Sequence, residues 1–366
     1  MMTKPVFQSI IANGHGLSRP SKGERMGRIT MEAIARIAKV SKGTVSKALN
    51  GEPGVGSETR ERIRAIAAAH NFHPNATASA LARRRSGTFG LAIPNQAGPV
   101  YEGAFWASLI VSVVTAAARR GIQTVILTPD AGEAGAASFA AALRCRSVDA
   151  LLIAAELMDQ RTLGALISER IPYVSIGGEL ASGAYSVDVD NEGGSKAMTE
   201  RLIAAGRRRI AFLVGPERYG YTAERVAGYE AALREAGIES LRVERSTYEA
   251  QAARTSARDV LASAFAPDAL FIAAGGPLML GALEGWRDAG ASGSGVALAV
   301  FDDSPILELM DPPVSAVRQP IAGMADAAIA ILTDLVEGKK PETPRIVLGT
   351  ELIARGVLEP RPPFDQ

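Results

Sequence analysis

Two short helices are predicted in residues 30–50, where apolar residues recur at helical spacing on either side of a polar break. The apolar positions are Ile34, Ala35 and Ala38 before the break, and Val45, Ala48 and Leu49 after it. Thr30 and Ser41 are placed to cap the two helices, and a short turn that ends at Ser41 joins them. The second helix presents Lys42 and Lys47 outward. The pair therefore predicts a helix-turn-helix that enters a DNA major groove, rather than a plain surface hairpin.

A third helix is predicted from Ser57 to His70, and Pro74 keeps the following residues from continuing it. Asn75 is placed to cap a further short helix over 76–82, and the basic, glycine-terminated segment 83–87 follows as a linker. These elements predict a small helical head that a linker joins to the rest of the chain.

From residue 89 onward, apolar strand-like runs alternate with helical segments. The strand-like runs are 89–94, 123–128, 150–154, 173–177, 210–214, 269–273 and 297–301, and the helical segments are 104–120, 191–205, 223–236, 252–264 and 278–289. Near-continuous apolar strands between helices predict parallel sheets that are covered on both faces. The length of this region predicts two similar α/β subdomains. We expect the extended segment 185–189 to cross between them.

Charge is segregated along the chain, although the formal net charge is only +1. Residues 1–88 hold 15 Lys and Arg against 5 Asp and Glu, a balance of +10, whereas residues 89–366 hold 25 against 34, a balance of −9. A basic head on an acidic body predicts a module that binds a polyanion. The helical periodicity of the head argues against a disordered basic tail, so nucleic acid is the expected partner.

The composition argues against several other classes of protein. The one cysteine, Cys145, excludes an internal disulfide and a multi-cysteine metal site, and we interpret it as a packing residue. The three histidines, His15, His70 and His73, lie in or before the head, so the body cannot form a His-based triad or metal cluster. The chain has no P-loop and no dinucleotide-binding fingerprint. We therefore expect no enzyme, no cofactor and no bound metal.

No run of residues is long and apolar enough for a membrane span, and residues 1–29 lack a hydrophobic signal region with a cleavage site. Residues 1–27 are expected to be a disordered or non-native extension, since Met26 directly precedes the head. The protein is accordingly expected in the cytoplasm, with no membrane partner.

Ten motifs follow one another from the head through the body. They are VSKGTVSKALNG (40–51), ETRERI (58–63), HPNATASALA (73–82), VDALLI (148–153), IPYVSI (171–176), VDVDNEGG (187–194), AAGRRRIAFLVGP (204–216), ERVAGYEAALREAG (224–237), VFDDS (300–304) and PPVSAVRQP (312–320). In this order they resemble the LacI/GalR family of bacterial transcriptional regulators. The resemblance covers about Arg28 to Glu359, which is nearly the whole chain.

The resemblance implies an N-terminal all-α helix-turn-helix head and an α/β periplasmic-binding-protein-like core of two parallel-sheet subdomains. It implies a DNA-binding domain over 28–74, a hinge helix and linker over 75–87, and an effector-binding and dimerisation core over 88–360. The N-subdomain is expected at about 88–187 and 319–346, and the C-subdomain at about 188–318 and 347–360. The family further implies a small-molecule cleft between subdomains and a homodimer that matches a pseudo-palindromic operator.

In the head, the resemblance assigns base-edge contacts to Lys42, Gly43 and Lys47. The lysines can donate to guanine O6 and N7, whereas Gly43 departs from the family and weakens one readout position because it has no side chain. Phosphate contacts, which position the head without reading sequence, are expected from Ser41, Thr44, Ser46 and Asn50.

Leu81 lies on the short helix that Asn75 caps, and both residues are predicted at the DNA interface. In the family a leucine at this place wedges between base steps in the minor groove and kinks the duplex. The alternative is that Leu81 packs against the body.

In the body, Arg225 and Asp302 occupy the two polar effector anchors of the family. A guanidinium and a carboxylate that face one cleft would bind hydroxyls, or a carboxylate, on a small ligand. Aromatic residues are predicted beside them, with core packing as the alternative for each: Tyr101, Phe105, Tyr219, Tyr221 and Tyr248. Segment 274–277 departs from sugar-responsive members, since Ala-Gly-Gly-Pro stands where they carry an Asn-Asp pair and one carboxylate acceptor is lost.

The sequence thus predicts a ligand-responsive, sequence-specific DNA-binding regulator, a repressor of carbohydrate-related genes with a carbohydrate-like effector. The alternative is a solute-binding protein, or a small-molecule sensor without a DNA-binding role, and such a protein would not need residues 30–82.

Overall fold

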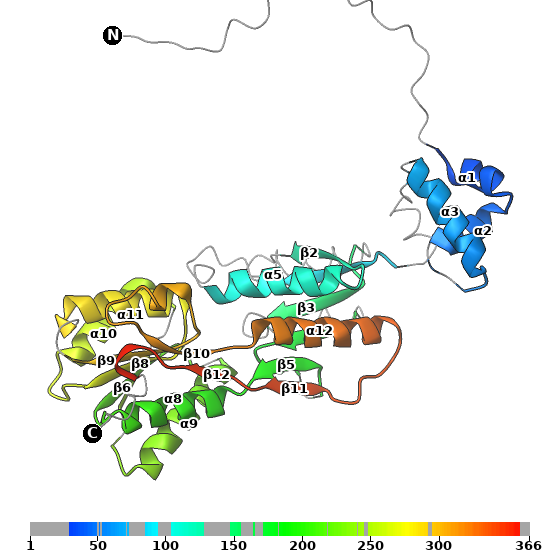
Figure 1. The fold of residues 1–366 in the computed structure, drawn as a ribbon. Coiled ribbons are helices and arrows are strands. Elements are labelled where there is room, and N and C mark those ends of the chain that lie inside the picture. The colour runs from blue at the N-terminus through cyan, green and yellow to red at the C-terminus, as the bar shows by residue number, and fades with distance from the viewer. Residues whose placement is uncertain are drawn as a thin grey trace, which may run out of the picture. The chain divides into compact units, whose positions relative to one another are not determined.

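The structure is a computed structural model of the 366-residue chain, and it divides into two compact units, residues 1–79 and 80–366 (Figure 1). The residues that it describes are 29–49, 51, 53–70, 72, 85–93, 104–127, 147–154, 164, 171–181, 183–217, 219–239, 241–244, 248–291 and 295–358. The predicted extension 1–27, the predicted helix 76–82 and Cys145 are among the features that lie outside these residues.

In the first unit, the described residues form three helices, as predicted: α1 (Met31–Ala38), α2 (Lys42–Leu49) and α3 (Ser57–Ala69). Thr30 Oγ1 accepts a hydrogen bond from the Ala33 amide (3.3 Å), and Ser41 Oγ accepts one from the Thr44 amide (3.0 Å), so both predicted caps are confirmed. The side chains of a shared buried core come from all three helices: Ile34, Ala35, Ala38, Val45, Ala48, Ile63 and Ala67. Val40, in the turn between α1 and α2, packs against this core.

The second unit contains two sheets, and the first has the strand order β11-β5-β4-β3-β1-β2 with every pair parallel. Its strands are β1 (Thr88–Ala92), β2 (Gln123–Leu127), β3 (Ala150–Ala154), β4 (Tyr173–Ile176), β5 (Ser186–Val189) and β11 (Arg345–Leu348). Helices α5 (Ala104–Ala118) and α12 (Ile321–Val336) pack on each other and on these strands. Their apolar side chains fill one core together with those of the sheet.

The second sheet has the order β12-β10-β9-β8-β6-β7, and its pairs are parallel except that β12 is antiparallel to β10. Its strands are β6 (Ile210–Val214), β7 (Leu241–Glu244), β8 (Ala269–Ile272), β9 (Ala297–Phe301), β10 (Ser315–Arg318) and β12 (Glu351–Ile353). Two helix pairs cover it: α8 (Asn191–Ala204) with α9 (Gly220–Glu235), and α10 (Ala250–Leu261) with α11 (Gly276–Asp288).

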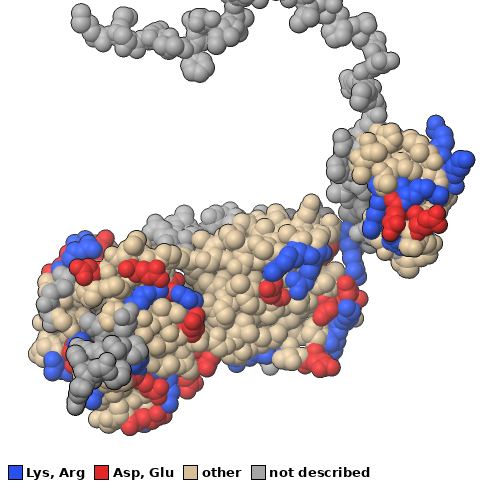
Figure 2. Space-filling model, viewed as in Figure 1, with Lys and Arg blue, Asp and Glu red and all other residues tan. Residues whose placement is uncertain are grey.

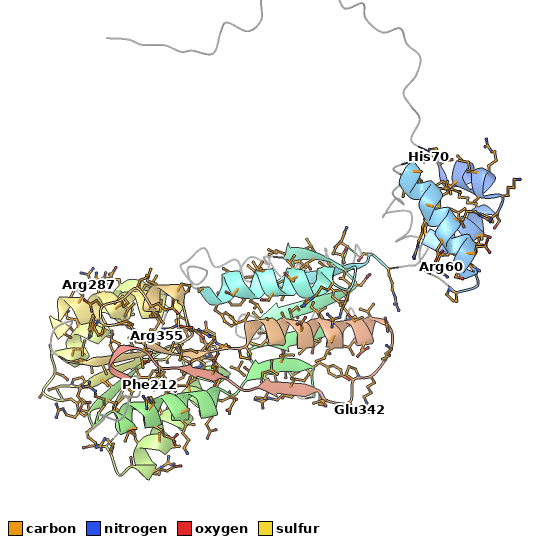
Figure 3. All side chains as sticks on the ribbon, in the orientation of Figure 1. Arg60, His70, Phe212, Arg287, Glu342 and Arg355 are labelled. Atoms are coloured by element: carbon orange, nitrogen blue, oxygen red, sulfur yellow. The ribbon has the colours of Figure 1, made fainter. Side chains whose placement is uncertain are left out.

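Successive side chains along a strand of the second sheet point to opposite faces, and each face packs against a pair of helices. In β6, Phe212 points into the core formed with α8 and α9, where Figure 3 labels it, and its neighbour Leu213 points into the core formed with α10 and α11. Strands that are buried on both faces read as continuous apolar runs, which is the pattern seen in the sequence. The predicted α/β class with two parallel-sheet subdomains is therefore confirmed.

Within the described part of the chain, the backbone passes between the two sheets after β5, after β10 and after β11. The predicted crossing at 185–189 is wrong, because β5 is a buried strand held between β4 and β11, and the chain leaves the first sheet only at Asp190. Asp188 breaks the apolar run of β5 and so hides the strand signal. Residues 188–189 and 347–348 accordingly belong to the first sheet rather than to the second subdomain.

None of the helices in the described ranges is both long enough and apolar enough to span a membrane.

Candidate functional site

The residues predicted to contact DNA lie along α2 and at its N-terminus. Lys42, Gly43 and Lys47 are exposed, as is Ser41, whereas the remaining two described residues of the set, Thr44 and Ser46, are half-buried. Val45 and Ala48 are buried on the opposite side of the helix. The helix therefore presents both predicted reading lysines to solvent. Asn50, Asn75 and Leu81 lie outside the described residues.

Several of the predicted contact residues already have partners in the head. Ser41 Oγ and Thr44 Oγ1 are 2.9 Å apart and share a hydrogen bond. Lys42 Nζ forms an ion pair with Glu32 on α1, and the hydrogen bond from Lys42 lowers the pKa of Glu32. Because both side chains of this pair are exposed, Lys42 can exchange the Glu32 carboxylate for another acceptor at little cost.

Gly43 is a free position in the head, and we predict that Gly43→Gln keeps the fold and changes the base preference. A Cβ at residue 43 would meet only Ser41 Oγ, at an ordinary 3.7 Å. Glutamine is also a better helix former than glycine, by about 0.5–1 kcal/mol. Its amide can read adenine in the major groove. Measured affinities of wild type and Gly43→Gln for operators that differ at single base pairs would show the change in base preference. If both proteins rank these operators in the same order, position 43 has no reading role.

In the body, polar groups from four segments meet at one edge of the second sheet. Strands β6, β8, β9 and β10 run parallel, so their carboxyl ends lie at the same edge. The segments that follow them carry Tyr219, Gly275, Asp302 and Gln319. Open α/β sheets bind ligands at this edge.

Asp302 follows β9 with φ of 91°, a left-handed conformation that is strained for a residue with a side chain. Its amide donates to Val317 O (3.0 Å). Its Oδ2 accepts from the Gly275 amide (2.9 Å), and its Oδ1 accepts from Gln319 Nε2. Each carboxylate oxygen has a second lone-pair direction, so Asp302 can still accept a hydrogen bond from a ligand hydroxyl.

Gly275 allows this close approach. A Cβ at residue 275 would lie 3.1 Å from Asp302 Cβ and 3.3 Å from its Oδ2, which is tighter than ordinary contact. The departure at 274–277 therefore removes an acceptor and at the same time supplies a backbone donor that holds the Asp302 carboxylate.

Arg225 is buried in α9, with only 4% of its surface exposed. Its Nε donates to Asn191 Oδ1 (2.9 Å), and its Nη1 donates to Ala273 O (2.6 Å). The guanidinium carbon lies 3.6 Å from the ring centroid of Phe301 and 4.8 Å from that of Tyr221. Four contacts fix the guanidinium, and Nη2 has no hydrogen-bond partner among the described residues, so it is the atom left for a ligand.

Three of the predicted aromatic residues stack on one another beside Arg225. The Tyr219 ring centroid lies 5.7 Å from that of Tyr221 and 5.8 Å from that of Tyr248, with interplanar angles of 5° and 21°. The hydroxyls of Tyr221 and Tyr248 are hydrogen-bonded to each other. Gly215 makes room for this cluster, because a Cβ there would overlap the Tyr248 phenol. The three rings therefore form one aromatic cluster beside Arg225, with Tyr219 buried between the other two.

The other two predicted aromatic residues do not join this cluster. Tyr101 lies outside the described residues. Phe105 is half-buried on α5, where it packs against the core of the first sheet and meets Trp106 edge to face at 5.5 Å. The interactions of the described residues do not connect Phe105 to Arg225 or Asp302, so its predicted effector role has no support from geometry.

Asn191 connects Arg225 to the first sheet. Its Nδ2 donates to Asp188 Oδ1 on β5 (3.3 Å) and to Glu224 Oε2 (3.0 Å), and Glu224 Oε1 accepts from Arg345 Nη2 on β11 (3.3 Å). Burial is the main cause that raises the pKa of Asp188. The hydrogen bond from the Val189 amide opposes it, the nearby charge of Glu224 adds to it, and the charges of Arg225 and Arg345 oppose it more weakly. Arg225, the predicted effector anchor, is thus linked through Asn191 to β5, and through Asn191 and Glu224 to β11.

Replacing Asp188 by Asn should raise the melting temperature of the chain at neutral pH. Asparagine keeps the oxygen that accepts from Asn191 and removes the buried charge. The expected gain is about 2 °C, the shift that ~1 kcal/mol gives in a domain of this size. Because the folded-state pKa is raised, the wild type loses stability as the pH rises above the unfolded-state value of about 4. Melting curves should show the gain of Asp188→Asn growing from about pH 4 to pH 7, and parallel pH profiles would contradict this account.

Gln319 and Asn191 were not predicted as site residues, yet they contact Asp302 and Arg225. Both stand in recognised motifs, PPVSAVRQP and VDVDNEGG. Their partners are 17 and 34 residues away in sequence, so no local spacing could reveal these contacts.

Comparison with known proteins agrees with these observations. Residues 30–75 match the bacterial regulatory proteins of the lacI family, and residues 199–357 match the periplasmic binding protein-like domain. The HTH-type transcriptional regulator CelR of Thermobifida fusca is 32% identical over 340 residues, which cover 91% of this chain and 99% of CelR.

Solved structures give the same result. The transcriptional regulator CelR–cellobiose complex has a TM-score of 0.67 at 31% identity and covers 90% of this chain and 100% of its own. The lac repressor dimer bound to operator and the anti-inducer ONPF has a TM-score of 0.72 at 22% identity, covers 90% and 99% of the two chains, and shares the fold.

Proposed function

The chain belongs to the lacI family of bacterial regulatory proteins, and on that premise we propose that it is a cytoplasmic repressor whose operator affinity is set by a carbohydrate effector. In this proposal the head binds operator DNA, the edge of the second sheet binds the effector, and the protein has no catalytic role. The effector acts by changing the relation of the two subdomains, which is a coupling between two sites through an element with two arrangements.

The observation that carries the effector part is the chemistry gathered at one sheet edge. The Asp302 carboxylate can accept a further hydrogen bond, the Arg225 guanidinium can donate one through Nη2, and the stacked tyrosines supply aromatic rings. Carbohydrates present hydroxyls around their rim and an apolar ring face, and this combination complements both. A sugar acid would also fit, through a charged hydrogen bond to Arg225.

We infer a disaccharide-sized effector, because CelR is described in complex with cellobiose and is 31% identical to this chain in that structure. A thermal-shift screen of the full chain against cellobiose, other disaccharides, glucose and sugar acids tests this. Binding at a concentration 100 times Kd stabilises the folded state by about 2.7 kcal/mol, which the screen detects easily. A shift with monosaccharides alone would contradict the inferred size, and no shift with any saccharide would contradict the effector class.

On the DNA side, we propose that Lys42 and Lys47 reach base edges and that Ser41, Thr44, Ser46 and Asn50 contact phosphates. Support comes from the exposure of the two lysines on α2. Leu81, which lies outside the described residues, is proposed to wedge into the minor groove from the helix predicted over 76–82. Retained bending of operator DNA by Leu81→Ala would contradict the wedge.

We propose a homodimer that uses α5 and the edge strand β2. Apolar side chains are exposed on both elements: Val111 at 66%, Val114 at 44%, Val125 at 37% and Ile126 at 46%. Figure 2 shows a largely uncharged surface along α5, with basic side chains at one end of it. Exposed apolar side chains in neighbouring elements mark a protein interface.

Val111→Asp is therefore expected to weaken dimerisation by about 30-fold or more, since a charge buried in an apolar interface costs ~2 kcal/mol. Analytical ultracentrifugation measures this, with Val347→Asp as the matched control because Val347 is an exposed valine (48%) on β11. Equal dimerisation of the two variants would place the interface elsewhere.

A further inference from the structure

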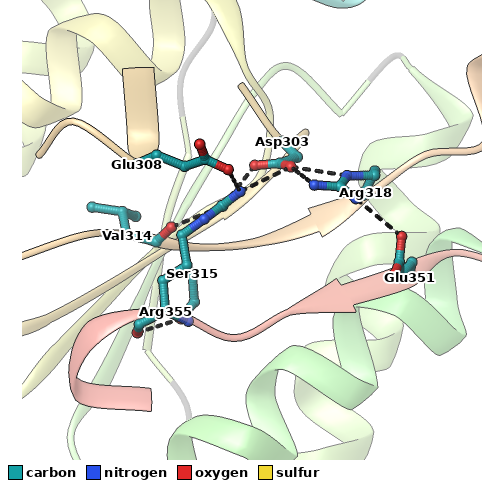
Figure 4. Close-up of polar contacts among 7 residues, drawn as sticks. All are labelled: Asp303, Glu308, Val314, Ser315, Arg318, Glu351 and Arg355. Carbon is teal, nitrogen blue, oxygen red and sulfur yellow. Dashed lines mark hydrogen bonds and ion pairs between the residues drawn. The ribbon is translucent and has the colours of Figure 1, made fainter. Parts of the chain in front are cut away.

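Asp303, the neighbour of Asp302, is held by two arginines (Figure 4). Arg355 Nη1 and Nη2 donate to its Oδ1 (2.7 Å) and Oδ2 (3.2 Å), and Arg318 Nε and Nη2 both donate to its Oδ2 (2.9 and 2.7 Å). The side chains of Asp303 and Arg355 are 10% and 9% exposed, and that of Arg318 is 46% exposed. We call Asp303, Arg318 and Arg355 the Asp303 clamp.

The Asp303 clamp ties together three strands of the second sheet. Asp303 follows β9, Arg318 ends β10, and Arg355 comes shortly after β12. Arg318 is also in register with Glu351 on β12, and its Nη1 donates to that carboxylate (3.3 Å). Arg355 is fixed by further bonds to Val314 O (3.2 Å), to Ser315 Oγ through its amide (2.9 Å) and to Glu308 Oε1 (2.9 Å).

Two successive residues after β9 therefore bind two successive residues at the end of β10. Asp302 accepts from Gln319, and Asp303 accepts from Arg318. The backbone is bonded in the same region, since the Asp302 amide donates to Val317 O (3.0 Å). The segment that carries the effector anchor is thus attached at several points to the place where the chain leaves the second sheet for the first.

The electrostatics of the clamp keep it assembled at neutral pH. Burial acts to raise the pKa of Asp303, but the hydrogen bonds and charges of Arg355 and Arg318 outweigh it and hold the pKa below its usual value. Buried ion pairs add little net stability compared with apolar side chains, and they serve geometry better than stability. The left-handed backbone of Asp302, one residue away, needs such support, because strained conformations persist only where their surroundings determine them.

We propose that the Asp303 clamp is a positioning unit that fixes the Asp302 carboxylate in its ligand-binding orientation and so sets effector affinity. Arg355 is its central positioning residue, because its planar fork meets both oxygens of Asp303. The clamp does not touch the ligand itself. The affinity part of this proposal rests on the proposed function, in which Asp302 binds the effector, whereas the positioning part does not.

Arg355→Lys in the full chain tests the clamp, because lysine keeps the charge and loses the fork. Amide hydrogen exchange at Gly275 and Asp302 should speed up about tenfold or more relative to wild type, since both amides are held by the geometry of Asp302. Exchange in β6 should stay unchanged. With cellobiose as the probe, calorimetry should give a Kd raised about tenfold. Glu308→Gln is the control, because it removes only the charge of the exposed partner of Arg355 (62%), keeps an oxygen that can accept from Arg355, and should change neither quantity.

Uniformly faster exchange, including β6, would show that Arg355 only stabilises the domain and would overturn the proposal, as would unchanged exchange at Gly275 and Asp302. If Arg355→Lys fails to fold, Arg318→Gln gives the same test from the more exposed side of the clamp. If the wild type does not bind cellobiose, the inferred effector fails and the exchange result still decides whether the clamp positions Asp302. Faster exchange with an unchanged Kd would overturn the affinity part.

Discussion

Asp302→Asn is expected to leave operator binding within about twofold of wild type and to weaken the effector response about 10- to 150-fold. That range is what the loss of one charged hydrogen bond of ~1.5–3 kcal/mol produces. Asparagine can still accept from the Gly275 amide, so the fold of the edge survives. Its Nδ2 donor would, however, face Gln319 Nε2, another donor, where the carboxylate now accepts. The effector concentration that halves the change in operator binding, read by fluorescence anisotropy, measures the loss.

Arg225→Lys is likewise expected to keep operator binding and to weaken the effector response. Lysine keeps the charge but cannot bond Asn191 and Ala273 and still present a donor to the ligand. Glu308→Gln serves as the control for both variants, since Glu308 contacts neither Arg225 nor Asp302. A normal response in Asp302→Asn and Arg225→Lys together would place the effector site elsewhere.

A chain that begins at residue 85 is expected to lose specific operator binding altogether, while the full chain binds with strong salt dependence. Residues 1–88 carry a balance of +10, and this truncation removes all but one of their basic side chains. If a dimer neutralises about six phosphates, log affinity should fall with log salt concentration at a slope of about −5. Electrophoretic or anisotropy titrations over a range of salt measure the slope. A flat dependence, or equal binding by the truncated chain, would contradict the assignment of DNA binding to the head.

The head could be predicted from sequence because its signals are local. Thr30 and Ser41 each cap a helix by accepting a hydrogen bond from the amide three residues later in the chain. The apolar residues around Ile34 and those around Val45 are each spaced along a single helix. The outward placement of Lys42 and Lys47 follows directly from that spacing. Periodicity and capping, which involve residues three or four apart, were sufficient here.

The edge of the second sheet was predicted only in part. Arg225, Asp302 and the three stacked tyrosines are predicted from the resemblance, whereas Gln319 and Asn191 make their contacts across long sequence separations.

Helix α9 begins at Gly220, three residues before the predicted start at 223, because the glycine and tyrosine in its first turn are more typical of a loop. Tertiary packing overrides that weak local preference.

The segments 185–189 and 274–277 also show that local sequence does not reveal contacts with distant residues. A polar residue inside a short strand, Asp188, concealed β5, although Asn191 and a backbone N–H bond its buried carboxylate. The sequence of 274–277 indicates the loss of an acceptor, whereas the hydrogen bond from the Gly275 amide to Asp302 depends on the folded arrangement of two strand ends. In both cases the deciding partner comes from outside the local segment.

The most direct test of the account is a titration of cellobiose into the full chain bound to an operator selected from random DNA, carried out on wild type and Asp302→Asn in parallel. The account predicts that cellobiose changes the operator affinity of the wild type several-fold, and that Asp302→Asn binds the same operator but does not respond at the same sugar concentration. An operator affinity that is unchanged by cellobiose and by every other saccharide in the wild type, or that changes equally in both proteins, would contradict it.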